Sequence, residues 1–238
     1  MADAYERGRP EYAPAVIGAI AAELGIRPGD RVLDLAAGTG KLTRALVAYG
    51  FAVTAVEPLE ALRAVLAEKV PAARVREGVA ERIPIEDRSV AAVMIADAFH
   101  WFDRPRALSE IRRVLARDGG VALLNTVPDW SGASWAHELG TLVAGTRPEH
   151  PHFDGRPWQE FVREASGFAE PWELRLTTYV PADPGRVLAH MTSMSWIAGL
   201  PEPERADVLA RMRTVVEAGE TPAQFPLHVE VGLTALLE

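Results

Sequence analysis

The stretch VLDLAAGTGKLT, residues 32–43, places an acidic side chain directly ahead of a glycine-rich turn. Asp34 lies in a branched apolar run that is typical of a buried strand, and Gly38 and Gly40 follow it. Two glycines between a strand and a helix usually mark close approach of the backbone to a ligand. In an open parallel sheet, ligands bind beyond the carboxyl ends of the strands, beside such a turn. The spacing therefore predicts a ligand site here.

Two classes of ligand compete for this turn. The pyrophosphate of a nicotinamide dinucleotide is bound by the pattern G-x-G-x-x-G, but Thr43 stands where the third glycine would be. The carboxylate of Asp34 would also repel a pyrophosphate a few ångströms away. The same carboxylate suits S-adenosylmethionine, which carries an ammonium and a sulfonium and no phosphate. The turn therefore favours a methyl donor over a nicotinamide dinucleotide.

A second acidic residue, Glu57, ends the next predicted strand, 23 residues after Asp34. An acidic side chain at this place can accept hydrogen bonds from both ribose hydroxyls of either ligand. Two structural alternatives stay open: Glu57 as a solvated strand end, and Asp34 as the N-terminal cap of a helix that begins at Lys41. The glycine pair alone could also form an ordinary tight turn.

Strands that alternate with helices must position these residues. Apolar runs predict strands at 31–35, 51–57, 73–78, 90–96 and 120–126, and helical spacing predicts helices at 12–24, 42–49, 59–66 and 106–115. This alternation indicates an α/β fold with a parallel sheet covered on both faces. Asp118, Gly119 and Gly120 are expected to close the last of these helices.

The second half of the chain is less regular. Two further strands are predicted within the segments 171–182 and 221–238. Residues 127–170 and 183–220 are expected to be cap insertions that bind substrate over the site. The whole chain is expected to form one domain, in which residues 1–126 are the cofactor-binding core.

Composition limits the possible classes of protein. Of the 238 residues, 48% are hydrophobic and none is cysteine, which predicts a soluble, cytoplasmic protein without disulfides. No run approaches the roughly 18 apolar residues of a membrane span. The net charge of −8 argues against nucleic acid as a partner, because neutralising phosphates requires clustered Lys and Arg. We expect neither a nucleic-acid nor a membrane partner, and the oligomeric state stays open.

Several motifs together resemble the class I S-adenosylmethionine-dependent methyltransferases. VLDLAAGTG is similar to their first motif and VTAVEP to their second, while GVAERIPIEDRSVAAVMIADAFHWFD and EIRRVLARDGGVALLN resemble their runs into the fourth and fifth strands. AFHWFD, with YERGRPEY before it and LPEPERADVLARMR after it, resembles a small-molecule subgroup that includes the trans-aconitate methyltransferase type. The resemblance implies a doubly wound, seven-stranded, mostly parallel Rossmann-like sheet with an antiparallel last strand and helical cap insertions. It also implies methyl transfer from S-adenosyl-L-methionine to a small molecule.

The resemblance implies a set of cofactor-binding residues. They are Asp34, Ala36, Gly38 and Gly40 around the methionine end, Glu57 at the ribose, Pro58 and Leu59 beside the adenine, Val79, Ala80 and Glu81 at its amino edge, and Ala96 near the sulfonium. Two of them depart from the family pattern. Ala36 replaces a common glycine and fits only if its φ is negative. Val79 replaces a common acidic residue, so adenine recognition would rest on backbone groups and Glu81.

Methyl transfer from a sulfonium is an in-line displacement, so positioning and exclusion of water supply most of the barrier reduction. A base is needed only where the nucleophile arrives protonated. His100 is the candidate base, because it follows the fourth predicted strand and histidine titrates near neutrality. The alternative is a structural histidine in an aromatic wall. Phe99 and Trp101, beside it, would pack or line the substrate pocket.

Further candidates lie outside these motifs. The resemblance implies that Tyr5 and Arg9 fold over the donor and bind substrate, unless this end is a frayed terminus. Trp130 would line the substrate pocket or pack within the insertion. His150 and His152 invite a metal interpretation, but the proline between them points the imidazoles apart and no third ligand has a suitable spacing, so we expect no metal. Two other functions stay open: a nicotinamide-dependent oxidoreductase, and a non-catalytic module that binds S-adenosylmethionine or a metabolite.

Overall fold

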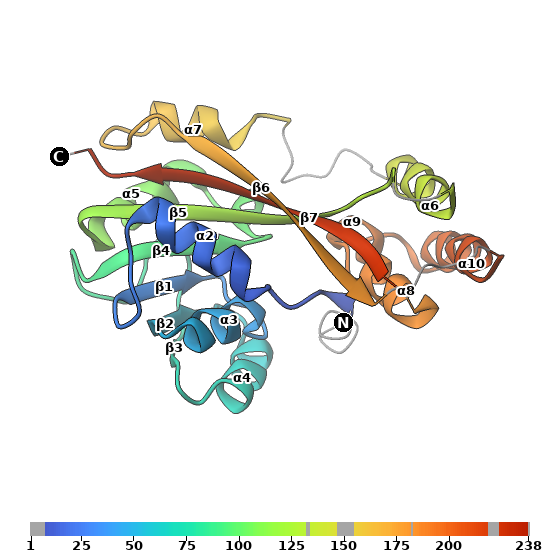
Figure 1. Ribbon diagram of the computed structural model, residues 1–238, viewed down its shortest axis with the longest axis horizontal. Coiled ribbons are helices and arrows are strands. Elements are labelled where there is room, and N and C mark those ends of the chain that lie inside the picture. The colour runs from blue at the N-terminus through green and yellow to red at the C-terminus, as the bar shows by residue number, and fades with distance from the viewer. Residues whose placement is uncertain (1–7, 132–133, 147–154, 182, 219–223, 238) are drawn as a thin grey trace. The chain divides into compact units, whose positions relative to one another are not determined.

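The short apolar runs of the sequence form the strands of a single seven-stranded sheet in the computed structural model (Figure 1). The structure describes residues 8–131, 134–146, 155–181, 183–218 and 224–237. The strands are β1 (Arg31–Leu35), β2 (Ala52–Val56), β3 (Arg74–Arg76), β4 (Val90–Ala96), β5 (Leu115–Pro128), β6 (Trp172–Pro181) and β7 (Gln224–Ala235). Their order across the sheet is β3-β2-β1-β4-β5-β7-β6.

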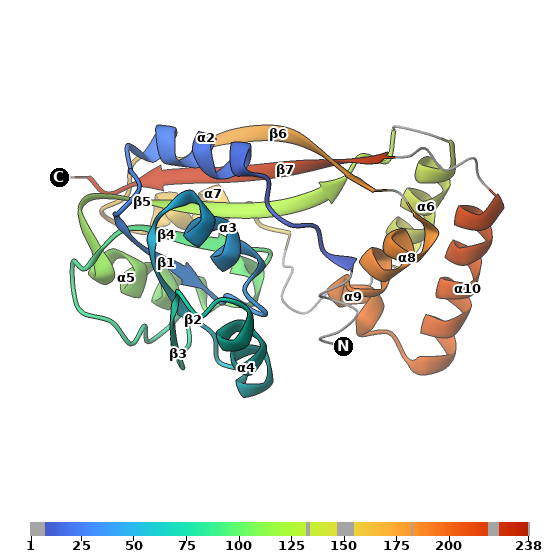
Figure 2. The ribbon, with the colours of Figure 1, turned by 60° about the horizontal axis from the view of Figure 1, so that its bottom comes forward.

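The strand pairing is parallel from β3 to β5. β7 runs in the opposite direction to β5 (Figure 2). The predicted α/β class, the mostly parallel sheet and its single antiparallel strand are therefore confirmed. The chain order reverses where β1 lies beside β4, with Asp34 in register with Met94. Ligands of open α/β sheets bind at this kind of reversal, at the carboxyl ends of the strands.

Helices cover both faces of the sheet (Figure 1 and Figure 2). The helices that the structure describes are, in chain order, α2 (Pro14–Leu24), α3 (Lys41–Tyr49), α4 (Glu60–Lys69), the short 3₁₀ helix η1 (Phe99–Trp101), α5 (Arg104–Val114), α6 (Ser134–Gly145), α7 (Trp158–Glu164), α8 (Pro184–Thr192), α9 (Ser195–Ala198) and α10 (Glu202–Ala218). The apolar stripes of α2 and α3 pack on one face of the sheet, and those of α5 and α7 pack on the other. Successive strand residues are therefore buried on opposite sides, as with Val32 and Leu33.

Capping residues and prolines in the sequence determine where helices α5 and α8 begin. The Asp103 carboxylate accepts a hydrogen bond from the Arg106 N–H at 3.4 Å and caps α5. The Asp183 carboxylate accepts one from the Arg186 N–H at 3.0 Å and caps α8. Each helix also has a proline in its first turn, where the missing N–H breaks no helical bond.

The turn predicted at Asp118 lies inside a strand instead. β5 already begins at Leu115, next to the last residue of α5, because Leu115 pairs with Val90. The pairing register then shifts before Gly120, and Asp118 takes a positive φ of 64°. The glycine-containing segment therefore forms an irregularity within β5 rather than the end of a helix.

Contacts divide the chain into two compact units. Unit 1 takes its described residues from Met1–Pro10, Val127–Asp154 and Thr177–His228, and unit 2 from Glu11–Thr126, Gly155–Leu176 and Val229–Glu238. This division differs from the expected one, which kept 127–170 together as a cap. Helix α7 belongs to unit 2, because Phe161 and Val162 are buried against the same core as Ile111 of α5.

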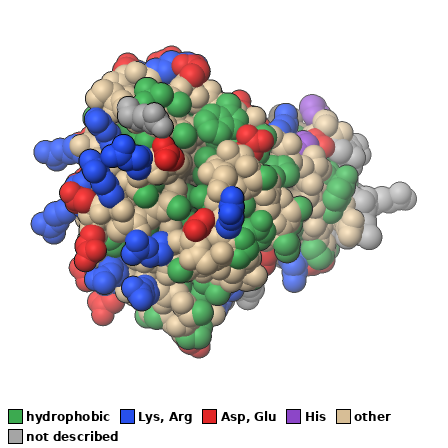
Figure 3. Space-filling view, turned by 60° about the vertical axis from the view of Figure 1, so that its left-hand side comes forward, with side chains coloured by type: hydrophobic (Ala, Val, Ile, Leu, Met, Phe, Trp, Pro, Cys, Tyr) green, Lys and Arg blue, Asp and Glu red, His purple; other side chains and the backbone are tan. Residues whose placement is uncertain are grey.

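Unit 1 has an apolar core of its own, built mainly from α6, α8 and α10. Leu139, Met191 and Met212 are fully buried in it, one from each of these helices. Among the described helices of the chain, none has the length and apolar character needed to cross a membrane. On the molecular face in Figure 3, Lys and Arg side chains gather on one side, with Asp and Glu among them.

Candidate cofactor site and its neighbours

Asp34 is a buried carboxylate at the carboxyl end of β1, with only 1% of its surface exposed. Its Oδ2 accepts a hydrogen bond from the Thr43 hydroxyl at 2.5 Å, and Oδ1 has no partner among the described residues. The pKa of Asp34 is raised to about 7, mainly by burial and to a smaller extent by the nearby charge of Glu57, against the opposing effect of the Thr43 hydrogen bonds. The site thus contains an unsatisfied acceptor that a cation or a donor would stabilise.

Asp34 is not the N-cap residue of α3, although its carboxylate does contact the first turn of that helix. Helix α3 is capped by Gly40, and no side chain takes part in that cap. Asp34 instead accepts a hydrogen bond from the hydroxyl of Thr43, which lies in the first turn of the helix. The Asp34 carboxylate therefore lies against the first turn of α3 and interacts with both the hydroxyl and the backbone N–H of Thr43.

The backbone of the turn is left-handed at three of the predicted positions. The φ angles are 61° at Ala36, 57° at Gly38 and 88° at Gly40. The expectation of a negative φ at Ala36 is therefore wrong, and alanine in this region costs roughly 1–2 kcal/mol because its Cβ crowds the carbonyl oxygen. The fold accepts this strain at the position where the family commonly has glycine.

The two glycines of the turn have different structural reasons. A Cβ on Gly38 would meet no heavy atom within 4 Å, so Gly38 borders open space. A Cβ on Gly40 would lie 2.3 Å from Cδ1 of Leu66 on α4, so Gly40 is required for packing. Only Gly38 has the open surroundings that a bound group needs.

Glu57 follows β2 and is 4% exposed, so the interpretation as a solvated strand end is wrong. Its Oε2 accepts a hydrogen bond from the Gly38 N–H at 2.9 Å, and its Oε1 accepts one from the Leu59 N–H at 2.9 Å. Glu57 therefore fixes the glycine turn against the loop after β2. A carboxylate oxygen has two lone pairs, so each oxygen can still accept a ligand hydroxyl.

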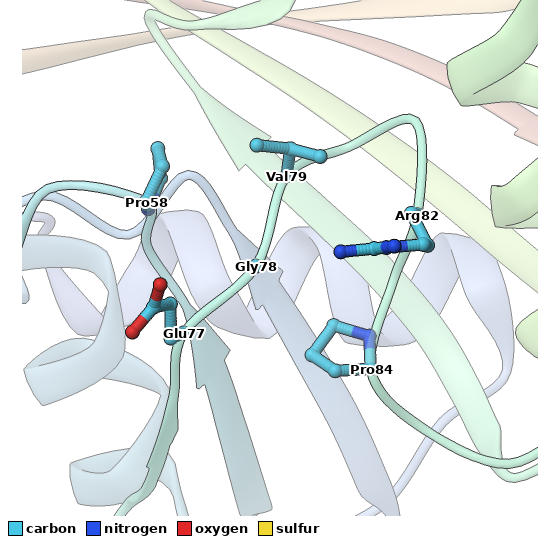
Figure 4. A pocket seen from close by; sticks show the side chains of 6 residues that line it. All are labelled: Pro58, Glu77, Gly78, Val79, Arg82 and Pro84. Carbon is cyan, nitrogen blue, oxygen red and sulfur yellow. The ribbon is translucent and has the colours of Figure 1, made fainter.

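An open pocket of about 600 Å³ includes Pro58, the residue after Glu57, in its lining (Figure 4). Its lining residues are Pro58, Glu77, Gly78, Val79, Arg82 and Pro84. Pro58 and Val79 were predicted as adenine neighbours, and Leu59, next to Pro58, is 60% exposed. Apolar side chains with a few polar groups around them are typical of small-molecule sites.

Sequence reasoning missed four of the pocket residues: Glu77, Gly78, Arg82 and Pro84. Glu77 makes an ion pair with Arg63 at 3.0 Å. A Cβ on Gly78 would lie 2.6 Å from Cδ of Pro84, so this glycine lets the two walls approach. Three of these four residues belong to the GVAERIP segment, which was the signal that could have identified them. In the structure this segment folds back on itself through a β-bridge between Val79 and Arg82.

Ala80 and Glu81 have surroundings different from those of Val79. Ala80 is buried in the core of unit 2. The Glu81 carboxylate accepts a hydrogen bond from the Asp103 N–H at 2.8 Å, which ties the loop to the start of α5. Both residues hold the segment that carries Val79, and neither lines the pocket that includes Pro58.

The carboxyl end of β4 carries the predicted catalytic segment. Ala96 is the last residue of the strand and is half-buried. Sequence reasoning passed over the next residue, Asp97, whose φ is 51° and whose Oδ1 accepts a hydrogen bond from the Thr126 N–H at 3.2 Å. This hydrogen bond joins the residue after β4 to the last part of β5. The position of an acidic residue directly after a predicted strand was the sequence signal that could have identified Asp97.

The helix η1 contains the three aromatic candidates. His100 is partly exposed, and its ring centroid lies 5.1 Å from that of Trp101, which is 47% exposed. Phe99 is buried in the core, edge-on to Phe102 with 6.0 Å between the ring centroids. Among these three residues, Phe99 is therefore the one that packs, and His100 and Trp101 reach the surface of unit 2.

Two of the predicted substrate residues lie in unit 1. Trp130 packs on α6, where a Cβ on Gly140 would lie 2.9 Å from its ring. Arg9 follows Gly8, whose carbonyl accepts a hydrogen bond from His190 Nδ1 at 3.1 Å. Tyr5, His150 and His152 lie outside the described residues. No group of three or more potential metal ligands occurs in the part of the chain that the structure describes.

Comparison with known proteins agrees with this geometry. Residues 33–123 match the family model described as a methyltransferase domain. An uncharacterised methyltransferase of Mycobacterium tuberculosis is 36% identical over 220 residues, which cover 90% of this chain and 82% of that protein. An uncharacterised methyltransferase-like protein of Schizosaccharomyces pombe is 32% identical over 90% of this chain and 83% of its own length.

The chain belongs to the class I S-adenosylmethionine-dependent methyltransferases. A crystal structure of a methyltransferase from an antibiotic biosynthesis pathway of Anabaena variabilis shares the fold of this methyltransferase, with a TM-score of 0.67 and 20% identity over 97% of this chain and 99% of the other. Membership of this enzyme family disfavours the oxidoreductase and the non-catalytic binding module. The glycine turn also fits a positively charged group, because Asp34 Oδ1 is buried without a partner among the described residues and Gly38 borders open space.

Proposed function

We propose that this methyltransferase binds S-adenosyl-L-methionine at the turn between β1 and α3 and transfers its methyl group to a small organic molecule. The buried Asp34 carboxylate carries the proposal, since its Oδ1 has no partner among the described residues. An unsatisfied buried acceptor costs about 1–3 kcal/mol, and a charge-assisted hydrogen bond from an ammonium would remove that cost. A diphosphate at the same place would add a second negative charge.

The other residues of the turn complete the proposed donor site. Glu57 holds the Gly38 N–H and retains acceptor capacity for the ribose hydroxyls. Pro58 and Val79 offer apolar surface for the adenine ring. Because Val79 has no polar side-chain atom, recognition of the adenine amino group would rest on backbone groups and on the pocket acid Glu77.

S-Adenosylmethionine, when bound, supplies a methyl group on a sulfonium that a nucleophile attacks in line. The chain contributes position and a water-poor environment, which account for most of the catalysis expected for such a displacement. His100 is our candidate for the residue that removes a proton from the acceptor, because it lies three residues after Asp97 at the carboxyl end of β4. A His100→Gln substitution should lower turnover and leave donor affinity within about twofold of the wild type. Wild-type turnover in this variant would exclude His100 as the base.

Unit 1 is the proposed source of acceptor specificity. Arg9 and Trp130 belong to it, and Trp101 is the exposed aromatic residue on η1. The resemblance to the trans-aconitate type places small carboxylic acids first among the acceptors to be tried. A guanidinium such as that of Arg9 would balance the charge of such an acid.

Calorimetry followed by a transfer assay tests the proposal. S-Adenosylmethionine and S-adenosylhomocysteine should bind at micromolar concentrations, and NADH should not bind. Transfer of a radiolabelled methyl group to members of a metabolite panel should then identify the acceptor. Binding of NADH without binding of S-adenosylmethionine would contradict the donor assignment, and transfer only to protein or nucleic acid would contradict the small-molecule acceptor.

A further inference from the structure

His190 of α8 is a buried histidine in unit 1, with 5% of its surface exposed. Its Nδ1 lies 3.1 Å from the carbonyl oxygen of Gly8. A carbonyl oxygen only accepts hydrogen bonds, so Nδ1 must carry the proton. In the neutral ring, Nε2 is then left with a lone pair that can only accept.

The imidazole is neutral at physiological pH. Burial and the nearby positive charge of Arg9 lower the pKa of His190 to about 3, against a smaller opposing effect of the Gly8 hydrogen bond. Nε2 is buried and has no hydrogen-bond partner within the described part of the chain. A buried acceptor without a partner costs about 1–3 kcal/mol, which a bound molecule with an O–H or N–H group would offset.

The segment that carries Arg9 is held closely against α8. A Cβ on Gly8 would lie 2.3 Å from the carbonyl carbon and oxygen of Ala189 and 2.5 Å from the backbone nitrogen of His190. Only glycine allows this approach, which brings the Gly8 carbonyl to Nδ1. Unit 1 therefore places a guanidinium and an unsatisfied acceptor near each other.

These two groups define the chemistry of a ligand. A guanidinium favours an anion, and a carboxylate matches its donor geometry. A carboxylate alone has no hydrogen to donate to Nε2, and an ammonium would be repelled by the guanidinium. A molecule with both a carboxylate and a hydroxyl group satisfies both.

We propose that His190 and Arg9 bind a hydroxycarboxylic acid in unit 1, with the ligand hydroxyl donating to Nε2 and its carboxylate facing Arg9. The assignment of this acid as the methyl acceptor rests on the function proposed above, whereas its binding does not. The methionine end of the donor also carries a carboxylate, so the experiment must separate the two sources.

Nitrogen NMR of the full chain labelled with ¹⁵N-histidine tests the proposal directly. The His190 signals are identified by their loss in His190→Gln. With S-adenosylhomocysteine at saturation, lactate or malate should move the Nε2 resonance upfield, as expected when an unprotonated ring nitrogen accepts a hydrogen bond. Propionate and succinate, which lack the hydroxyl, should leave it unchanged.

Each other outcome of this titration would overturn the proposal. A shift caused by S-adenosylhomocysteine alone would assign Nε2 to the donor. Equal shifts with the hydroxy acids and their matched controls would remove the hydroxyl from the contact. The absence of a shift with every acid at tens of millimolar would exclude the ligand class. Failure of S-adenosylhomocysteine itself to bind would instead count against the proposed donor site.

Two substitutions separate the two ring nitrogens. In His190→Asn the amide N–H can replace Nδ1 and keep the contact with Gly8, but no atom replaces Nε2. In His190→Gln the amide oxygen can replace Nε2 as acceptor. By calorimetry, the Asn variant should bind the hydroxy acid at least tenfold more weakly and the Gln variant within about threefold of the wild type. Both should keep wild-type affinity for S-adenosylhomocysteine, and unchanged acid binding by the Asn variant would overturn the proposal.

Discussion

The Thr43 hydroxyl donates a hydrogen bond to the Asp34 carboxylate over 2.5 Å, and both side chains are buried. Thr43 occupies the place where a dinucleotide-binding turn has its third glycine. That glycine allows close packing of helix and strand in the dinucleotide folds, whereas threonine here supports a negative charge. Thr43, which stands in place of the third glycine, therefore argues against a pyrophosphate and also stabilises the Asp34 carboxylate that would bind a cation.

Donor binding should strengthen as the pH rises through 7. Asp34 has a pKa of about 7 in the free protein, so most of the population has a neutral side chain at pH 6 and no charge to offer the donor ammonium. If the bound acid is ionised, the Kd for S-adenosylmethionine should fall about eightfold between pH 6 and pH 7.5, with release of a proton. Calorimetry in buffers of different ionisation enthalpy measures both quantities.

Two variants control this experiment. Asp34→Asn should bind weakly with a Kd that varies little over the same pH range. Thr43→Val removes the hydrogen bond that lowers the pKa, so its transition should move to higher pH. A wild-type Kd that is equal at pH 6 and 7.5 would contradict the role of Asp34.

The same carboxylate should destabilise the free protein at neutral pH. The folded-state pKa of about 7 lies above the usual 3.8, so between these values the folded state holds a proton that the unfolded state has lost. Stability should therefore fall as the pH rises from about 4 to 7 and then level off. Asp34→Asn should be more stable than the wild type at pH 8, by up to about 4 kcal/mol, with a smaller difference at pH 5. Urea unfolding at both pH values measures this, and a less stable Asn variant at pH 8 would be inconsistent with it.

Local sequence patterns were sufficient for the strands and for the two buried acids. The alternation of apolar runs and helical spacing depends on neighbours along the chain, and so does the placement of Asp34 and Glu57 at strand ends. The role of Gly40 depends on Leu66, which is distant in sequence, and no local pattern indicated the positive φ at Ala36. These features required the three-dimensional structure.

The membership of α7 illustrates the same limit. This helix lies in a segment that was expected to be a cap insertion, and its apolar residues do not by themselves indicate which core buries them. Phe161 joins the core of unit 2 through contacts with a helix about fifty residues earlier in the chain. The residues of the pocket wall, Arg82 and Pro84, were similarly hidden, because their position depends on how one loop folds back.

Gly38→Ala and Gly40→Ala should have different effects although the two residues are neighbours in one turn. A Cβ on Gly38 meets no atom of the described protein, so this variant should fold with a loss of only about 1–2 kcal/mol from its positive φ. It should bind S-adenosylhomocysteine at least tenfold more weakly, because the new methyl enters the space proposed for the donor. Gly40→Ala should lower the melting temperature much more, because its Cβ would overlap Leu66.

Thermal unfolding and calorimetry of the two glycine variants distinguish these effects. Gly40→Ala with Leu66→Ala is a matched control, since the second substitution removes the atom that the new Cβ would meet. If Gly38→Ala binds S-adenosylhomocysteine as tightly as the wild type does, the open space at this turn is not the donor site.

Arg113 should hold in place the pocket wall that contains Pro84. Its guanidinium donates to the carbonyl oxygens of Ile83 at 2.8 Å and Ile85 at 3.0 Å, and it pairs with Glu110 and Asp87. Lysine keeps the charge but cannot make these contacts together. Arg113→Lys should therefore cost roughly 1–3 kcal/mol and speed hydrogen exchange at residues 83–89, next to the pocket residue Pro84. Arg112→Lys, which removes one contact with the Ser166 carbonyl, is the matched control, and equal exchange in the two variants would show that Arg113 does not support this wall.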